Sequence, residues 1–162
     1  MRLFILVLVA GIATGASAQN TDLQTYTFDR VGVAVTLPSG FAVEQVLEDH
    51  LPDVGVVLLV DEDAGRTLSV EIHTYFEPEQ ASAYGHGERA QTELAHLPGV
   101  EAASPASYPV PAGSAFRFGD DTYRGVALYG CDEIRCYHVS ATATGDDEGV
   151  LAEMLEGVHF EG

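Results

Sequence analysis

The alternation of apolar and polar residues predicts that most of this chain forms β-strands. The pattern is clearest in residues 66–76, where Leu68, Val70 and Ile72 point to one side and polar residues point to the other. The other strand-like segments are 24–30, 31–37, 41–47, 54–60, 114–119, 122–130 and 136–144. Segment 54–60 is apolar throughout, which predicts a central strand that is covered on both faces.

Helical periodicity is found in two segments. In the first, residues 78–97, Pro78 suits the first turn of a helix, whereas Gly85 and Gly87 each weaken its middle by up to about 1 kcal/mol relative to alanine. We therefore expect this helix to start late or to bend at the glycines. Pro98 ends it.

The second helical segment is residues 146–158, in which the apolar residues recur at helical spacing. Asp146 or Asp147 is expected to cap its start, and Gly157 its end. Short turns join the strands, which favours antiparallel pairing. The sequence thus predicts a single α+β domain, with a mostly antiparallel sheet and two main helices packed on it.

The first 18 residues have the features of a secretory signal peptide. Arg2 precedes an apolar run, residues 3–13, and Ala16-Ser17-Ala18 forms an A-x-A cleavage site. The run is shorter than the roughly 20 apolar residues that span a bilayer. We expect cleavage after residue 18, a single domain over residues 19–162, and a soluble protein in the bacterial periplasm or the medium, without stable membrane anchoring.

The chain is strongly acidic, and it contains no lysine. Its 25 acidic residues outnumber seven arginines and give a net charge of −18. Such a surface repels phosphate backbones and anionic lipids, so no binding to nucleic acid is expected. The charge suits a cationic partner or solubility in salt.

Both cysteines lie in residues 131–138, together with two acids, an arginine and a histidine. Three kinds of chemistry compete for this stretch. A redox centre favours C-x-x-C, but four residues separate these cysteines, and a zinc site with His138 would lack an evident fourth ligand. Export and hairpin geometry instead favour a disulfide between Cys131 and Cys136 that staples a turn.

The disulfide also predicts the register of a hairpin. With the cysteines opposite each other, Tyr129 faces His138 and Leu128 faces Val139. One face of this hairpin is then a core face, with Val126, Leu128, Tyr137, Val139 and Ala141. The consistent alternation on both flanks supports the pairing.

The less apolar face of the predicted sheet gathers the side chains best suited to bind a ligand. They are Glu71, His73, Tyr75, Arg117, Tyr129 and His138. Aromatic rings, histidines and a lone arginine on one sheet face suit a ligand groove. Alternatively, a helix covers this face and these residues satisfy one another.

No motif in the sequence marks a catalytic residue. G-x-S-x-G, histidine pairs at metal-binding spacing and glycine-rich phosphate loops are absent, so we expect no catalytic residues, no metal site and no cofactor. The acidic stretches 61–65 and 145–149 lack the twelve-residue spacing of a calcium loop. Simple acidic turns are therefore favoured over calcium sites there.

Two short segments resemble PsbP-like domains. Residues 32–41, G-V-A-V-T-L-P-S-G-F, are similar to the opening G-V-x-V-x-L-P-x-G-W/F hairpin of that family, with Phe41 as the final aromatic. Residues 155–160, L-E-G-V-H-F, resemble its last helix and the short strand after it. Between these segments only the order of elements is similar. The resemblance implies an accessory or binding module and brings no catalytic residues with it.

The sequence therefore favours an exported, soluble accessory or binding module with no evident catalytic activity. Its expected partner is an envelope protein or a small ligand. The alternative is a small exported enzyme of hydrolase type, in which His73 or His138 works with Glu71 as a base.

Overall fold

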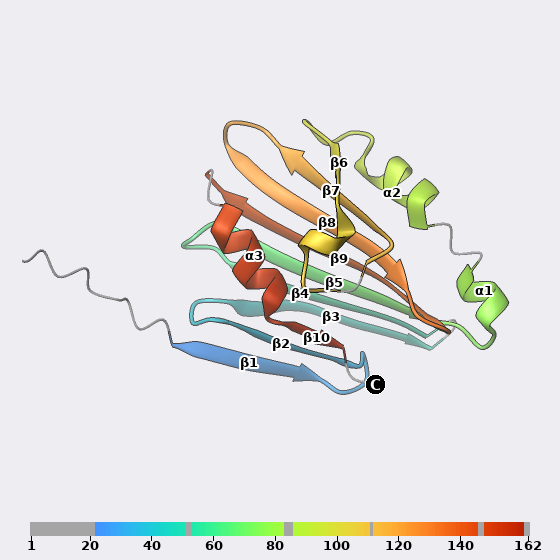
Figure 1. Cartoon of the computed structure of the whole chain (residues 1–162). Helices are drawn as coiled ribbons and strands as arrows, with labels where there is room; N and C mark the ends of the chain where they lie inside the picture. The colour runs from blue at the N-terminus through green and yellow to red at the C-terminus, as the bar shows by residue number, and fades with distance from the viewer. Residues whose placement is uncertain (1–21, 51–52, 83–85, 111, 146–147, 161–162) are drawn as a thin grey trace, which may run out of the picture.

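The computed structural model describes residues 22–50, 53–82, 86–110, 112–145 and 148–160, so the predicted signal peptide lies outside it. The strands form two antiparallel sheets that lie against each other (Figure 1). The small sheet has the order β1-β2-β10, and the large sheet has the order β3-β4-β5-β9-β8-β7-β6. The predicted α+β class is confirmed.

The elements follow the predicted order along the chain, except that β6 forms in a stretch for which no strand was predicted. The strands are β1 Leu23–Phe28, β2 Val33–Pro38, β3 Ala42–His50, β4 Asp53–Asp61, β5 Arg66–Thr74, β6 Glu101–Ala103, β7 Ser114–Gly119, β8 Tyr123–Cys131, β9 Arg135–Thr144 and β10 Val158–Phe160. The helices are α1 Pro78–Ser82, α2 His86–Leu94 and α3 Glu148–Glu156, with a 3₁₀ turn η1 at Pro105–Ser107.

The two faces of the large sheet have different coverings. The small sheet and α3 cover one face and bury a large apolar cluster that includes Val35, Leu59, Leu128 and Leu155. Helix α2 packs on the other face over β8, where a second apolar cluster is smaller. We call these the core face and the helix-α2 face. The core face holds most of the buried apolar surface, which is the main source of stability.

Strand β4 corrects one prediction, because it is covered on one face and not on both. Val57 and Leu59 are fully buried on the core face. Val56 and Leu58 alternate with them and are only half-buried on the helix-α2 face. Because α2 lies over β8, on the other side of β5 and β9 from β4, it does not seal these residues.

The predicted break in the first helical segment is confirmed. Helix α1 ends at Ser82 and α2 begins at His86, while Gly85 lies outside the described residues. Gly87 falls in the first turn of α2, where glycine removes fewer intrahelical contacts than it would in the middle.

Gly157 follows α3 as expected, but it is needed there for a different reason. Its φ is not in the left-handed region, so the expected cap geometry is absent. A Cβ at this position would lie 1.9 Å from the carbonyl oxygen of Thr36. The backbone N–H of Thr36 also donates to the carbonyl oxygen of Gly157 at 2.8 Å. Glycine therefore allows the end of α3 to approach β2. The two expected start caps lie outside the described residues.

The β8–β9 hairpin has the predicted register and the predicted disulfide. Cys131 is paired with Cys136, and Tyr129 lies opposite His138. The two sulfur atoms lie 3.7 and 3.4 Å from the carbonyl oxygen of Ala81 in α1. Because a disulfide sulfur carries no hydrogen, this contact is packing, and it places α1 against the closed end of the hairpin.

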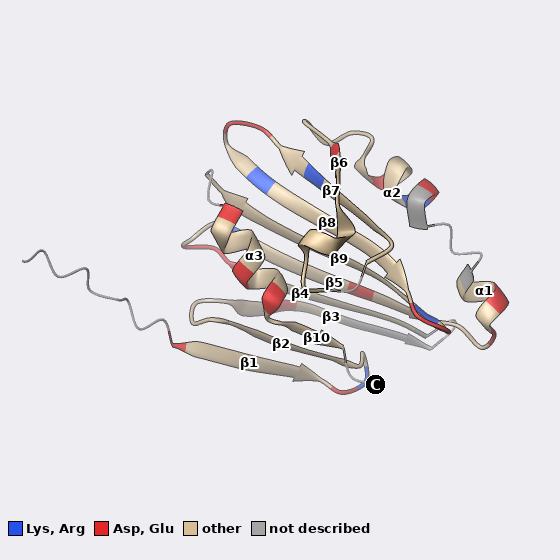
Figure 2. Ribbon diagram, viewed as in Figure 1, with Lys and Arg blue, Asp and Glu red and all other residues tan. Residues whose placement is uncertain are grey.

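Acidic residues lie on all three helices and in the connections between strands (Figure 2). Charged residues also occur within strands, among them Glu71 of β5, Arg117 of β7 and Arg124 of β8. None of the described helices has the length and hydrophobicity needed to cross a membrane.

Candidate functional site

Strand pairing brings four of the predicted ligand-face residues together. Glu71 and His73 lie two positions apart on β5, so they point to the same side. Glu71 is directly opposite His138 of β9, which is in turn opposite Tyr129 of β8. Three adjacent strands therefore present their polar side chains at one place on the helix-α2 face.

Helix α2 adds two residues to this group. Arg89 and Glu93 lie one turn apart and form an i,i+4 ion pair, while Ala90 and Leu94 of the same helix are buried against the sheet. We call the assembled group the polar cluster: Glu71, His73, Arg89, Glu93, Tyr129 and His138. It joins the helix to three strands of the sheet.

Arg89 is the centre of the polar cluster. Its Nη2 donates to Glu71 Oε1 at 2.6 Å, and its Nε donates to Glu93 Oε1. His73 also donates from Nε2 to Glu71 Oε1, so this nitrogen carries the proton and its 3.3 Å approach to Arg89 Nη1 is a contact between two donors. One guanidinium thus bridges a carboxylate on the sheet and a carboxylate on the helix.

His138 lies deeper in the polar cluster. Its ring stacks on Tyr129 with the centroids 4.2 Å apart, and its Nδ1 lies 3.5 Å from Glu93 Oε2. Burial lowers the pKa of His138, and the nearby Glu93 and Glu71 carboxylates offset only part of this effect, which keeps the ring neutral near neutral pH. Its Nε2 is buried without a hydrogen-bond partner in the part of the chain that the structure describes.

The arrangement makes Glu71 a very weak base. The hydrogen bond from His73 and the positive charge of Arg89 outweigh the effect of burial and lower the pKa of Glu71 to about 2. A general base works best with a pKa near the working pH. The geometry therefore supports the alternative in which a helix covers this face and its residues satisfy one another.

Tyr75 belongs to the edge of this region. Its ring lies parallel to His73, with the ring centroids 6.4 Å apart. Burial raises the pKa of Tyr75; the positive charge of Arg89 opposes this increase, and the charge on Glu71 adds to it. The phenol is therefore neutral and extends the polar cluster toward the end of β5.

Arg117 corrects the predicted ligand face, because it lies on the core face. It is paired with Val126, whereas Phe116 and Phe118 point to the helix-α2 face. The prediction took the two phenylalanines for core residues. The helix-α2 face of β7 is in fact apolar, since the smaller cluster under α2 takes the aromatic rings.

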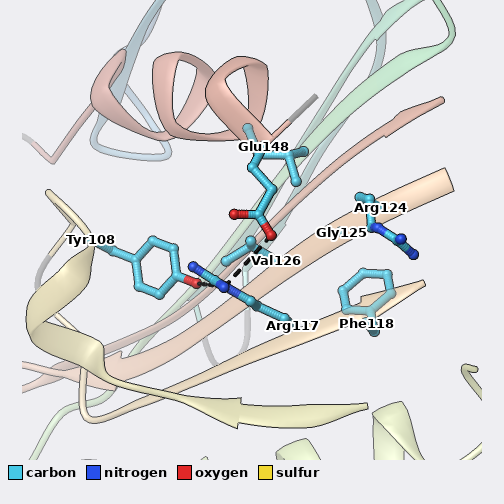
Figure 3. Close-up of a pocket in the computed structure, with 8 residues that line it drawn as sticks. Tyr108, Arg117, Phe118, Arg124, Gly125, Val126 and Glu148 are labelled. Carbon is cyan, nitrogen blue, oxygen red and sulfur yellow. Dashed lines mark hydrogen bonds and ion pairs between the residues drawn. The ribbon is translucent and has the colours of Figure 1, made fainter. Parts of the chain in front are cut away.

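Arg117 contributes to a small pocket at the start of α3. Its Nε donates to the Tyr108 hydroxyl at 3.2 Å, and its Nη1 lies 3.6 Å from Glu148 Oε1, as Figure 3 shows. The pocket has a volume of about 60 Å³, which is enough for a few water molecules. Glu148 already balances the arginine, so this pocket is a weak candidate for a ligand.

Sequence reasoning missed Arg89 and Glu93. Their i,i+4 spacing beside the apolar Ala90 and Leu94 was the available signal, because it places the ion pair at the border of the buried helix face. The helix was predicted, but nothing in its own sequence indicates which part of the sheet it covers.

The polar cluster has side chains of the types that bind metals, but Arg89 lies between them. Among the described residues, no group of three or more histidine, cysteine or acidic side chains is arranged to hold a metal ion. In the acidic stretch 61–65, Asp61 Oδ1 accepts from the backbone N–H of Ala64 at 3.0 Å and so forms part of the turn.

A second region lies where the β8–β9 hairpin closes. The backbone N–H of Tyr75 donates to the Ile134 carbonyl at 2.8 Å, which joins the end of β5 to the hairpin tip. Phe76, next along the chain, is 75% exposed, and Ile134 is 39% exposed. We call Phe76, Ile134 and the Cys131–Cys136 disulfide the hairpin end. Large apolar side chains exposed together at one place are typical of interaction sites.

Beside the hairpin end there is a cleft of about 220 Å³. It is lined by Ile72, Cys131, Asp132, Arg135, Tyr137 and Phe160. Its walls come from both sheets, because Phe160 belongs to β10 of the small sheet and the other residues to the large sheet or its hairpin.

No protein-family model and no curated protein matches this chain. Among solved structures, the chain is similar to the PsbP of the cyanobacterium Synechocystis over 92% of this chain and 98% of that protein, with 12% sequence identity and a TM-score of 0.45. It is also similar to a protein of Bacteroides thetaiotaomicron over 85% of this chain, with 12% identity and a TM-score of 0.49. Since the match covers 48% of the Bacteroides protein, this chain spans about half its length.

The Synechocystis protein represents the family that residues 32–41 and 155–160 resemble. The PsbP resemblance of the sequence is thus found again among solved structures.

Proposed function

We propose that this protein is an exported binding module without catalytic activity, and that it contacts its partner through the hairpin end. The observation that supports this proposal is a contrast between two regions. The polar cluster pairs its charges internally, whereas the hairpin end exposes large apolar side chains to solvent.

The polar cluster gives little support to the hydrolase alternative. Glu71 accepts from both Arg89 and His73, and its low pKa leaves it with little affinity for a proton. His138 is stacked on Tyr129 beneath α2 and would have to be uncovered to meet a substrate. The group is better suited to fastening α2 to the sheet.

The hairpin end has the properties of a contact surface. Fully burying a side chain such as that of Phe76 contributes about 1.5–3 kcal/mol, and a few such anchors dominate most protein interfaces. The disulfide and the ordered β5–β9 pairing fix the backbone beneath it, so a partner would order few additional groups on binding.

Capture of partners from an envelope extract tests the proposal. The tagged mature protein and the control variant Leu23→Ser should retain the same partner, because Leu23 is 62% exposed but lies at the start of β1, at the other end of the molecule (Figure 1). The double variant Phe76→Ser/Ile134→Ser should lose it. Turnover of an ester or peptide substrate that disappears in His73→Asn would contradict the proposal.

Export is tested separately by intact-mass measurement. We expect the exported protein to begin at Gln19, with or without cyclisation of that glutamine. A mass that includes residues 1–18 would count against export through a cleaved signal peptide.

A further inference from the structure

We propose that the cleft beside the hairpin end is a socket for one large apolar side chain, presented by a basic segment of a partner protein. This inference rests on the proposed function and adds to it the place of binding and the chemistry of the partner. It is carried by the position, the size and the charge of the cleft.

The walls of the cleft are mainly apolar and firmly held. Ile72 and Tyr137 are neighbours across the β5–β9 pairing and are both buried. The Phe160 ring lies 4.8 Å from the Tyr137 ring and closes the side that faces the small sheet. The surfaces that a ligand would touch are therefore fixed by strands of two sheets before anything binds.

The size of the cleft decides between two classes of occupant. Sites for small molecules typically measure about 300–1,000 Å³, and this cleft is smaller, at about 220 Å³. It has room for one side chain and not for a complete ligand of ordinary size. Protein interfaces are commonly anchored by a single aromatic or large aliphatic side chain in such a pocket.

The rim of the cleft carries a pair of charges that neutralise each other. Nε and Nη2 of Arg135 both lie 2.9 Å from Asp132 Oδ2, and Asp132 also accepts from the backbone N–H groups of Ile134 and Arg135. The arginine is thus engaged by a carboxylate that is itself fixed in the turn. An anionic ligand would have to compete with Asp132, so the rim favours an uncharged anchor.

The surroundings favour a basic segment around that anchor. Glu133 at the hairpin tip and Glu77 after Phe76 are exposed, and the whole chain carries a net charge of −18. Such a field attracts cationic partners and repels anionic ones, mainly through the rate of association. The apolar anchor would supply the affinity, and the basic flanks would supply the orientation.

Fluorescent peptides test the anchor and the flanks independently on the full mature protein. The probes are Lys-Lys-Gly-Phe-Gly-Lys-Lys, the same peptide with serine in place of phenylalanine, and the same peptide with glutamates in place of the lysines. By fluorescence anisotropy, we expect the first to bind at least tenfold more tightly than the second. The third should not bind measurably.

Three variants locate the binding. Phe160→Ala should weaken binding of the phenylalanine peptide about tenfold and leave the serine peptide unchanged. Glu133→Lys changes an exposed residue outside the apolar walls, so it should weaken both basic peptides without affecting the fold. Leu23→Ala should change neither. A thermal melt of Phe160→Ala checks that its effect on binding does not reflect unfolding. If Phe160→Ala does not fold, Glu133→Lys still tests where the basic peptides bind.

The possible outcomes separate this inference from the proposed function. Equal binding of the phenylalanine and serine peptides would overturn the socket, because the attraction would then be due to charge alone. Competition by free N-acetylphenylalanine amide as strong as that of the peptide would assign the cleft to a small molecule instead. If the peptides fail but capture through Phe76 and Ile134 persists, the socket is wrong and the binding module stands.

Discussion

The two faces of the large sheet are held to their coverings by different interactions. On the core face, apolar side chains such as Val35, Leu59 and Leu128 pack the small sheet and α3 against the strands. On the helix-α2 face, a small apolar cluster is accompanied by the polar cluster around Arg89. Apolar burial stabilises without specifying direction, whereas ion pairs and hydrogen bonds fix geometry and add little net stability. The first face should therefore determine whether the protein folds, and the second where α2 lies.

The largest effect is expected from truncating a core-face residue. Leu128→Ala should lower the free energy of unfolding by about 2–5 kcal/mol, because Leu128 is fully buried and a cavity would remain. Urea unfolding of Leu94→Ala, in the short helix α2, provides the comparison and should show a smaller loss. Equal losses would mean that α2 is as much a part of the cooperative core as β8.

The second-largest loss of stability is expected from removing the arginine of the polar cluster. Arg89→Met removes the cation between Glu71 and Glu93 and should lower the free energy of unfolding by about 2–3 kcal/mol. Breaking a fully buried ion pair costs about 3–5 kcal/mol, but these side chains are partly exposed. Adding Glu71→Gln should recover part of this loss, as a double-mutant cycle would show. Arg117→Met is the control: that arginine is 53% exposed, and its loss should cost less than about 1 kcal/mol. Additive effects of the two cluster substitutions would contradict the bridging role of Arg89.

The disulfide lies on the helix-α2 face and should make a moderate contribution to the free energy of unfolding. Replacing both Cys131 and Cys136 with serine should lower the free energy of unfolding by about 1–3 kcal/mol, because the bond closes only a short loop. The fold should persist, while the contact with Ala81 in α1 is weakened. Thiol titration of the unfolded, unreduced protein should detect no free thiol. Two free thiols in exported material would contradict the structural role.

The smallest expected effect is the pH dependence of the free energy of unfolding that arises from the helix-α2 face. The pKa of Glu71 is about 2 in the folded protein against an ordinary value of 4.5, so its contribution to stability is present above pH 4.5 and is lost as the pH falls toward 2. After allowance for solvent screening, this amounts to about 1–2 kcal/mol. His138 acts in the same direction, because its lowered pKa makes the folded state bind a proton less readily than the unfolded state below pH 6.5.

Unfolding in urea across this pH range measures the effect. The decrease in stability below pH 4.5 should be shallower in Glu71→Gln than in the wild type, since glutamine does not titrate. Identical slopes would show that Glu71 is not stabilised by its partners in the folded state.

The β8–β9 hairpin shows how far local patterns can be followed. Its register was predictable because the two cysteines and the alternation on both flanks lie within one continuous stretch. Strand β7 shows where such reasoning fails. Phe116 and Phe118 indicated a core side, but the smaller apolar cluster under α2 takes them, and Arg117 turns to the core face instead. A strand's own alternation separates two faces without saying what covers each of them.

The sequence by itself determined most of the strands, the α+β class, the hairpin register and the disulfide, because each depends on residues close together in the chain. Only the tertiary structure decided that the strands divide into two sheets, that β5 lies beside β9, and that α2 covers their neighbour β8. The polar cluster depends on all of these contacts: Glu71 meets His138 through the β5–β9 pairing, and Arg89 meets Glu71 through the position of α2. Contacts between segments so far apart in the chain are selected by the packing of whole layers, which the period of a single strand or helix does not record.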